Sequence, residues 1–237
     1  MKQYKITIWW PVCVTSLLLA PTVAPQDSNQ ALQQKLAAFK ESVIQNQAAL
    51  RQYSWIQKTQ LSLKGDVKST KVESCRYGPD GQVQKTQVSE PVEQKKKRGI
   101  RGKVVGGKIE DMKDYMERTI SLIERYVPPS PERLKSVANQ GNASFRPTGP
   151  DTIELQFKDY VKKGDAVTFA LDMAAQRIAQ LNVNTYLADE DKDPISLAVT
   201  FQTLPDATNY PATKVLNVTA KQIVVKVDSS NYQKLAN

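Results

Sequence analysis

Histidine is absent from the 237 residues of this sequence, and cysteine occurs only twice, at Cys13 and Cys75. Without histidine, a Ser-His-Asp triad, a Cys-His pair and a histidine-built metal site are all excluded. A glycine-rich phosphate loop is missing as well, because Gly106 and Gly107 lack the following Lys-Ser/Thr of that motif. The sequence therefore favours a protein that is not an enzyme, with no catalytic residues, metal ligands or cofactor.

The first 24 residues have the order of a secretory signal peptide. Lys2 and Lys5 form a short basic region, an uncharged and largely apolar stretch runs from residue 6 to residue 26, and small residues lie at 20–24. This order is typical of a cleaved export signal. A membrane anchor is the alternative, because 21 uncharged residues are just long enough to span a bilayer. We expect residues 1–24 to be removed and residues 25–237 to form a single exported domain.

Once the signal is removed, Cys75 is the only cysteine left in the sequence. An internal disulfide is then excluded, so the fold has to be held together by packing. A single cysteine within a strand pattern is most often a small buried side chain, and we expect Cys75 to be one.

Excess positive charge is confined to one segment. The sequence holds 33 basic and 24 acidic residues, which gives a formal net charge of +9. Seven cations with no acidic residue among them lie close together: Lys95, Lys96, Lys97, Arg98, Arg101, Lys103 and Lys108. Without them and the two lysines of the signal, basic and acidic residues balance at 24 each. Nearby proline and glycines predict that residues 89–108 form a basic loop.

A nucleic-acid partner is not expected for this loop, because no aromatic residue lies between Tyr77 and Tyr115 to stack on bases. Anionic lipid attracts each nearby Lys or Arg by about 1 kcal/mol. The predicted contacts with an anionic membrane surface or an acidic protein involve Lys95, Lys96, Lys97, Arg98, Arg101 and Lys103. The alternative is a solvated flexible loop.

Helical spacing of apolar residues appears in two long stretches. It predicts an amphipathic helix over about residues 29–51. A second helix is predicted over about residues 110–126, with an apolar stripe formed by Met112, Met116, Ile120 and Ile123. A short third helix is expected to begin at Ser130-Pro131, an N-cap residue followed by a proline in the first helical position.

The rest of the chain alternates with period two, which is typical of strands that bury one face. Three such stretches lie between residues 55 and 88, and about seven more lie between residues 143 and 227. Together they predict an α+β fold: a curved antiparallel sheet of about nine to ten strands, forming an incomplete β-barrel. The N-terminal helix and the central helices are expected to cover its concave face.

This layout resembles that of the bacterial carriers that sort outer-membrane lipoproteins, the LolA/LolB-like superfamily. The resemblance rests on the order of signal, long helix, meander beginning at Tyr53-Ser54-Trp55, central helices and strand-rich half. It also rests on the Ile195–Leu204 stretch and the sequence Leu204-Pro205-Asp206-Ala207-Thr208-Asn209-Tyr210-Pro211. The stretch from Tyr53 to Lys103 also looks like exported proteins with a Lys-rich loop. The resemblance implies an unclosed barrel around a helix-covered apolar cavity that holds acyl chains.

From this resemblance we expect a monomeric protein of the cell envelope that binds a lipid or a lipidated partner, such as the acyl chains of a lipoprotein. The candidate lining residues of the apolar cavity are Trp55, Leu61, Leu63, Phe169, Leu171, Leu181, Val183, Leu197 and Phe201. The alternative is a structural or interaction module of the periplasm. In that case the chain fills its own core, and the basic loop contacts anionic surfaces.

Overall fold

The computed structural model describes residues 41–88 and 100–235, and over 100–109 it describes the backbone only. The expected signal peptide and most of the first predicted helix lie outside these residues. The cations at positions 95–98 lie outside them as well.

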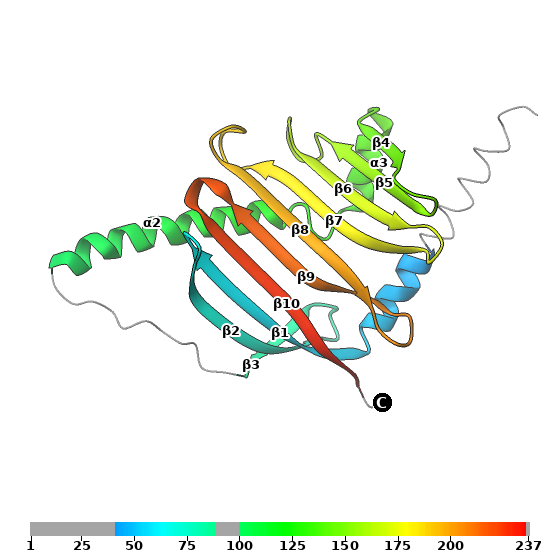
Figure 1. The fold of residues 1–237 in the computed structure, drawn as a ribbon, viewed down its shortest axis with the longest axis horizontal. Helices are drawn as coiled ribbons and strands as arrows, with labels where there is room; N and C mark the ends of the chain where they lie inside the picture. The colour runs from blue at the N-terminus through cyan, green and yellow to red at the C-terminus, as the bar shows by residue number, and fades with distance from the viewer. Residues whose placement is uncertain (1–40, 89–99, 236–237) are drawn as a thin grey trace, which may run out of the picture.

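Ten antiparallel strands form one open sheet in the described part of the chain (Figure 1). Their order is β3-β2-β1-β10-β9-β8-β7-β6-β5-β4, so β3 and β4 are the edges and the sheet does not close into a barrel. The strands are β1 (Tyr53–Leu63), β2 (Asp66–Tyr77), β3 (Val83–Gln87), β4 (Ala143–Pro147), β5 (Thr152–Lys158), β6 (Ala166–Asp172), β7 (Arg177–Tyr186), β8 (Pro194–Thr203), β9 (Asn209–Val218) and β10 (Ile223–Lys234). The predicted α+β fold with an open sheet of nine to ten strands is confirmed.

Most neighbours in the sheet are consecutive along the chain, and the exception joins its two halves. The last strand, β10, pairs with the first, β1, in a register that sets Tyr53 opposite Lys234 and Leu63 opposite Ile223. β1 and β2 meet in a two-residue turn in which both Lys64 and Gly65 have positive φ, at 55° and 85°. Such turns match the right-handed twist of paired strands.

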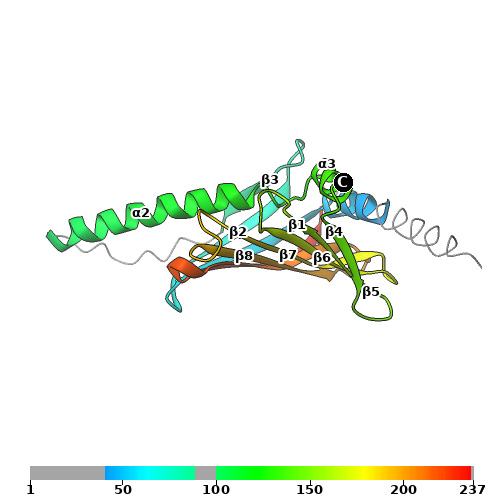
Figure 2. The ribbon, with the colours of Figure 1, turned by 90° about the horizontal axis from the view of Figure 1, so that it is seen from above.

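Helices lie on one face of the sheet and leave the other face bare (Figure 2). Residues 41–50 are helical, and they are followed along the chain by α2 (Ile100–Ile123) and α3 (Pro131–Asn139). The Ser130 hydroxyl caps α3 by accepting a hydrogen bond from the backbone N–H of Arg133 at 3.3 Å, as the Ser-Pro pair predicts. None of the helices in the described ranges is both long and apolar enough for a membrane crossing.

α2 corrects two details of the sequence interpretation. It begins at Ile100, so the predicted loop over 89–108 is helical from residue 100 onward, and the N-terminal half of α2 projects beyond the sheet in both views (Figures 1 and 2). Its buried side chains are Tyr115, Thr119 and Leu122, whereas Ile120 of the predicted stripe is 47% exposed. Met112, Met116 and Ile123 of the predicted stripe are half-buried and pack against the core, so the stripe is confirmed except for Ile120.

The core lies between α2, α3 and the helix-bearing face of β5–β9. Strand residues of one parity are buried, as in β8, where Ile195, Leu197 and Val199 alternate with exposed or half-buried neighbours. Tyr115 and Leu122 of α2 pack in the same cluster. A buried apolar side chain of this size contributes about 1.5–3 kcal/mol, so this face is the main source of stability.

A buried carboxylate holds the end of α2 against the sheet. Asp165, in the turn before β6, accepts hydrogen bonds from the Tyr126 hydroxyl at 2.6 Å and from the backbone N–H of Tyr160 and Lys162 at 2.5 and 2.8 Å. The Tyr126 hydroxyl also lies 2.8 Å from that of Thr185 in β7. Tyr126 is fully buried, and burial together with the hydrogen bond to Asp165 raises the pKa of its phenol. One side chain thus connects a helix end, a turn and a strand.

Candidate functional site

The nine residues predicted to line an apolar cavity share the helix-bearing face but not one environment. Five of them are buried in the core beneath α2 and α3: Phe169, Leu171, Leu181, Val183 and Leu197. Side chains of the helices occupy the space above them, Tyr115 and Leu122 of α2 and Val137 of α3 among them. The structure brings these five together as core, and their contact with a ligand stays a prediction.

Three further candidates lie at the margin of that core. Leu61 and Leu63 of β1 and Phe201 of β8 pack against it while remaining half-buried. Leu61 lies opposite Val225 of β10, which is also half-buried. Leu61, Leu63 and Val225 extend the apolar surface from the covered part of the face onto β10 and β1. We call the part of the helix-bearing face that is formed by β10, β1, β2, β3 and residues 209–214 of β9 the open half.

Trp55, the ninth candidate, belongs to an aromatic cluster at one end of the open half. Its ring stacks on Tyr232 at 5.6 Å between centroids and lies 5.3 Å from the ring of Tyr77. Tyr232 in turn lies 4.3 Å from Tyr210 and 6.3 Å from Tyr53. Burial raises the pKa of the Tyr232 phenol. Strands from both ends of the chain therefore supply one aromatic surface.

Polar groups occupy the middle of the open half, beside the aromatic cluster. The Lys71 ammonium lies 2.6 Å from the buried Glu73 carboxylate, and both project from β2. Cys75, two residues further, is buried as expected, and burial is the main reason that the pKa of its thiol is raised. Nearby lysines oppose that effect, Lys85 most of all and then Lys214 and Lys71. The thiol is thus a packed group within reach of three positive charges.

Lys214 of β9 is the residue of this face that sequence reasoning missed. It shares its parity with Ala212, Leu216 and Val218, all buried, and it is itself half-buried. Burial lowers the pKa of its ammonium, and the charge of Lys85 lowers it further. The signal was available in the sequence, because a lysine in phase with an apolar row indicates a charge on the buried face.

The basic residues predicted to meet an anionic surface are only partly described. Arg101 and Lys103 lie in the first turns of α2, and nothing is described of their side chains. The four cations at 95–98 lie outside the described residues.

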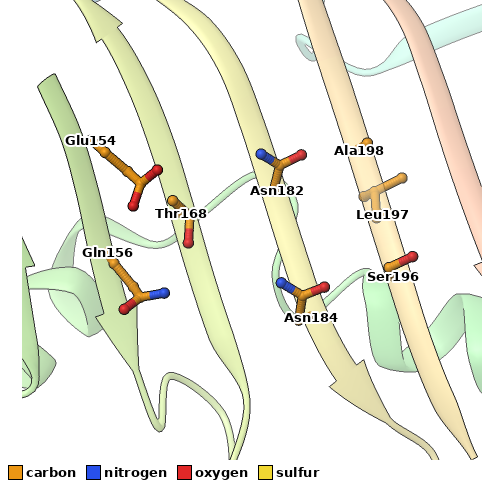
Figure 3. Close-up of a pocket in the computed structure, with 8 residues that line it drawn as sticks. All are labelled: Glu154, Gln156, Thr168, Asn182, Asn184, Ser196, Leu197 and Ala198. Carbon is orange, nitrogen blue, oxygen red and sulfur yellow. The ribbon is translucent and has the colours of Figure 1, made fainter. Parts of the chain in front are cut away.

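On the bare outer face, polar side chains line an open hollow of about 420 Å³ over β5–β8 (Figure 3). Asn182 and Asn184 alternate along β7 with the buried Leu181 and Val183, so they point away from the core. The lining residues are Glu154, Gln156, Thr168, Asn182, Asn184, Ser196, Leu197 and Ala198. Only Glu154 ionises among them, and its carboxylate pairs with Arg146 at 2.9 Å. The hollow offers hydrogen-bonding groups without a nucleophile beside a base.

Metal chemistry finds no support in the described residues, where no group of three or more Cys, Asp or Glu side chains could hold an ion. No protein-family model matches the sequence, and no curated protein matches it.

Three solved structures are similar to this chain in the overall path of the backbone. A DUF1329 family protein from Desulfovibrio piger shares 9% identity with a TM-score of 0.37, covering 84% of this chain and 92% of that one. A LolA superfamily protein from Nitrosomonas europaea shares 12% identity with a TM-score of 0.34, covering 83% and 93%. A domain assigned to outer-membrane lipoprotein sorting, from Vibrio parahaemolyticus, shares 12% identity with a TM-score of 0.31, covering 81% and 91%. Two of the three have names that belong to the lipoprotein-sorting superfamily named in the sequence analysis.

Proposed function

We propose that this protein is a non-enzymatic binding protein of the periplasm that holds a lipid, or the acyl chain of a lipidated partner, on the open half of its helix-bearing face. The observation that carries the proposal is the change of burial along that face. Beneath α2 and α3 the apolar side chains are covered, whereas Leu61, Leu63 and Val225 keep part of their surface exposed. An acyl chain would remove that surface from water.

The open shape of the sheet supports the same proposal. The edge strands β3 and β4 do not pair with each other, so the sheet is not closed into a barrel. A ligand can therefore reach the helix-bearing face without breaking hydrogen bonds between strands. The aromatic cluster around Trp55 ends the aliphatic surface with flat rings that pack readily against hydrocarbon. In the alternative, a structural or interaction module, the chain itself would cover Leu61 and Val225.

We expect the protein isolated from its own periplasm to carry lipid. Native mass spectrometry of the full chain should show an adduct of lipid mass, and the double replacement Leu61→Gln with Val225→Gln should reduce its occupancy by about tenfold or more. Each replacement removes an apolar contact, and burial of such a side chain is worth about 1.5–3 kcal/mol.

The neighbouring cross-strand pair provides a matched control. Ser62 and Val224 oppose each other on the same two strands but point to the outer face. Ser62→Gln with Val224→Gln should leave the adduct unchanged. A lipid-free mass of the unaltered protein would favour the self-filled module, and equal losses in both double variants would move the ligand away from the open half.

The basic segment is proposed to bring the protein to an anionic surface. We expect the full chain to co-sediment with vesicles rich in anionic lipid at low salt. Replacing Lys95, Lys96, Lys97 and Arg98 with Gln should abolish this while leaving the melting temperature nearly unchanged. Salt should weaken the binding, because exposed charges are screened over about 8 Å at physiological ionic strength.

An equal loss of charge elsewhere is the control for the basic segment. Four exposed lysines scattered over the described surface can be replaced by Gln together: Lys58, Lys113, Lys135 and Lys158. This variant should still co-sediment if the cluster is what matters. Binding that survives high salt would instead indicate an apolar contact.

A further inference from the structure

Lys214 sits where the sheet otherwise presents apolar side chains. Across the ladder it lies opposite Val199 of β8 on one side and Val227 of β10 on the other. Residues directly opposite share a face, and Val199 is buried in the core. The Lys214 ammonium therefore projects from a central strand onto the helix-bearing face, among valines.

Positive charge exceeds negative charge around it. Lys71 is reached from Lys214 along the same cross-strand row, through Val227 and Thr59, and its ammonium is already paired with Glu73. Lys85 of β3 lies opposite the buried Cys75. Within the described ranges, no carboxylate lies within ion-pair distance of Lys214 or Lys85. Among the residues that the structure describes, the half-buried Lys214 and the exposed Lys85 thus have no anionic partner.

A half-buried ammonium without a counter-charge is costly, and charged hydrogen bonds are roughly twice as strong as neutral ones. A ligand with an anionic oxygen would supply the negative charge that the Lys214 ammonium lacks. Next to the lysines on the same face run Leu216 and, across the ladder from it, Val225 and then Leu61. Leu216 is buried, so the surface left for a chain is that of the half-buried Val225 and Leu61, which lie on neighbouring strands about 4.8 Å apart.

We propose that the ligand of the open half is an anionic amphiphile, whose carboxylate or phosphate head is held by Lys214 and whose chain lies along Val225 and Leu61. This inference rests on the proposed function and specifies its ligand class. Charge complementarity selects the head group, and the aliphatic surface selects the chain.

The test compares two probes of one chain length, dodecanoate and dodecan-1-ol, by titration calorimetry on the full chain after its lipid has been removed. We expect dodecanoate to bind about tenfold more tightly, and added salt to weaken only dodecanoate. Lys214→Met should abolish the preference without weakening dodecan-1-ol, and Lys214→Arg should retain it. Lys58→Gln, an equal charge loss on an exposed outer-face lysine, should change neither affinity.

Stability gives a second readout that a merely structural lysine would not satisfy. Without ligand, Lys214→Met should melt at the same temperature as the unaltered protein or higher, because an unpaired charge is removed from the face. A large drop in melting temperature, or a carboxylate preference that survives Lys214→Met, would overturn the inference while leaving the proposed function intact. Failure of both probes to bind would instead refute the proposed function.

A final arm separates a lipid head group from a free anion. Dodecyl phosphate should bind far more tightly than inorganic phosphate, because only the former uses the aliphatic surface. Equal affinities would mean an anion site without a chain site, and would overturn the proposed amphiphile.

Discussion

Replacing Asp165 with Ala is expected to lower the free energy of unfolding by about 3–5 kcal/mol. Asp165 is 1% exposed, and its carboxylate accepts from the Tyr126 hydroxyl and from backbone N–H groups of the turn that follows β5. The replacement leaves those buried donors without partners, and each unsatisfied group costs about 1–3 kcal/mol. Denaturant titration followed by circular dichroism would measure the loss.

Two other variants test whether the buried hydrogen bonds of Asp165 are responsible for this loss of stability. Asp114→Ala removes an exposed carboxylate from α2 and should change stability by less than about 0.5 kcal/mol. Tyr126→Phe deletes one donor but leaves the backbone donors of Asp165 in place, so its cost should be about 1–2 kcal/mol. A loss below about 1 kcal/mol for Asp165→Ala would mean that the turn rearranges and that α2 is held by packing alone.

Replacing Trp55 with Ala should lower the free energy of unfolding by about 3–5 kcal/mol. The indole is 7% exposed and contacts Tyr77 and Tyr232, so its removal leaves a cavity between strands from both ends of the chain. Aromatic pairs add about 0.5–1.5 kcal/mol beyond the area that they bury. The shift of the urea midpoint at constant slope would report the loss.

Phe145→Ala is the matched control, since Phe145 is 59% exposed and its loss should cost little. A cost below about 1 kcal/mol for Trp55→Ala would show that the cluster repacks without the indole. If stability held and the lipid adduct disappeared, Trp55 would be a ligand contact and not part of the core.

The strands were predictable because each buries one face, and burial of one face imposes alternation directly on the sequence. Ile195, Leu197 and Val199 show this, and the register of β8 with its neighbours follows from it. α3 was predictable for a different reason, since the Ser130-Pro131 pair marks a helix start locally.

The start of α2 was not predictable from composition. Gly102, Gly106 and Gly107 each disfavour a helix by about 1 kcal/mol relative to alanine, which points to a loop. Once the turns near Tyr115 are fixed against the sheet, however, each added residue gains a hydrogen bond without a new nucleation cost. The helix extends to Ile100 in spite of its glycines.

The candidate site was only half predictable. The alternation of apolar residues predicted that Leu61 and Trp55 share one face, and both lie on the helix-bearing face. Period-two reasoning cannot tell which apolar residues a helix will cover, because coverage depends on where α2 crosses a distant strand. The same reasoning missed Lys214, because a search for apolar lining residues leaves out a lysine even where it alternates in phase with them.

The pairing of β1 with β10 bears on the order in which the chain can fold. Strands β4 to β10 can assemble as a meander from neighbours close in sequence, and β1 to β3 as another. The ladder that unites them sets Tyr53 opposite Lys234, so it can form only after β10 has been synthesised. Contacts this distant in sequence fold slowly, and until then β1 and β10 each present an unpaired edge that another chain could capture. During synthesis the β1–β3 meander would thus have to wait with an unpaired edge that needs protection from aggregation.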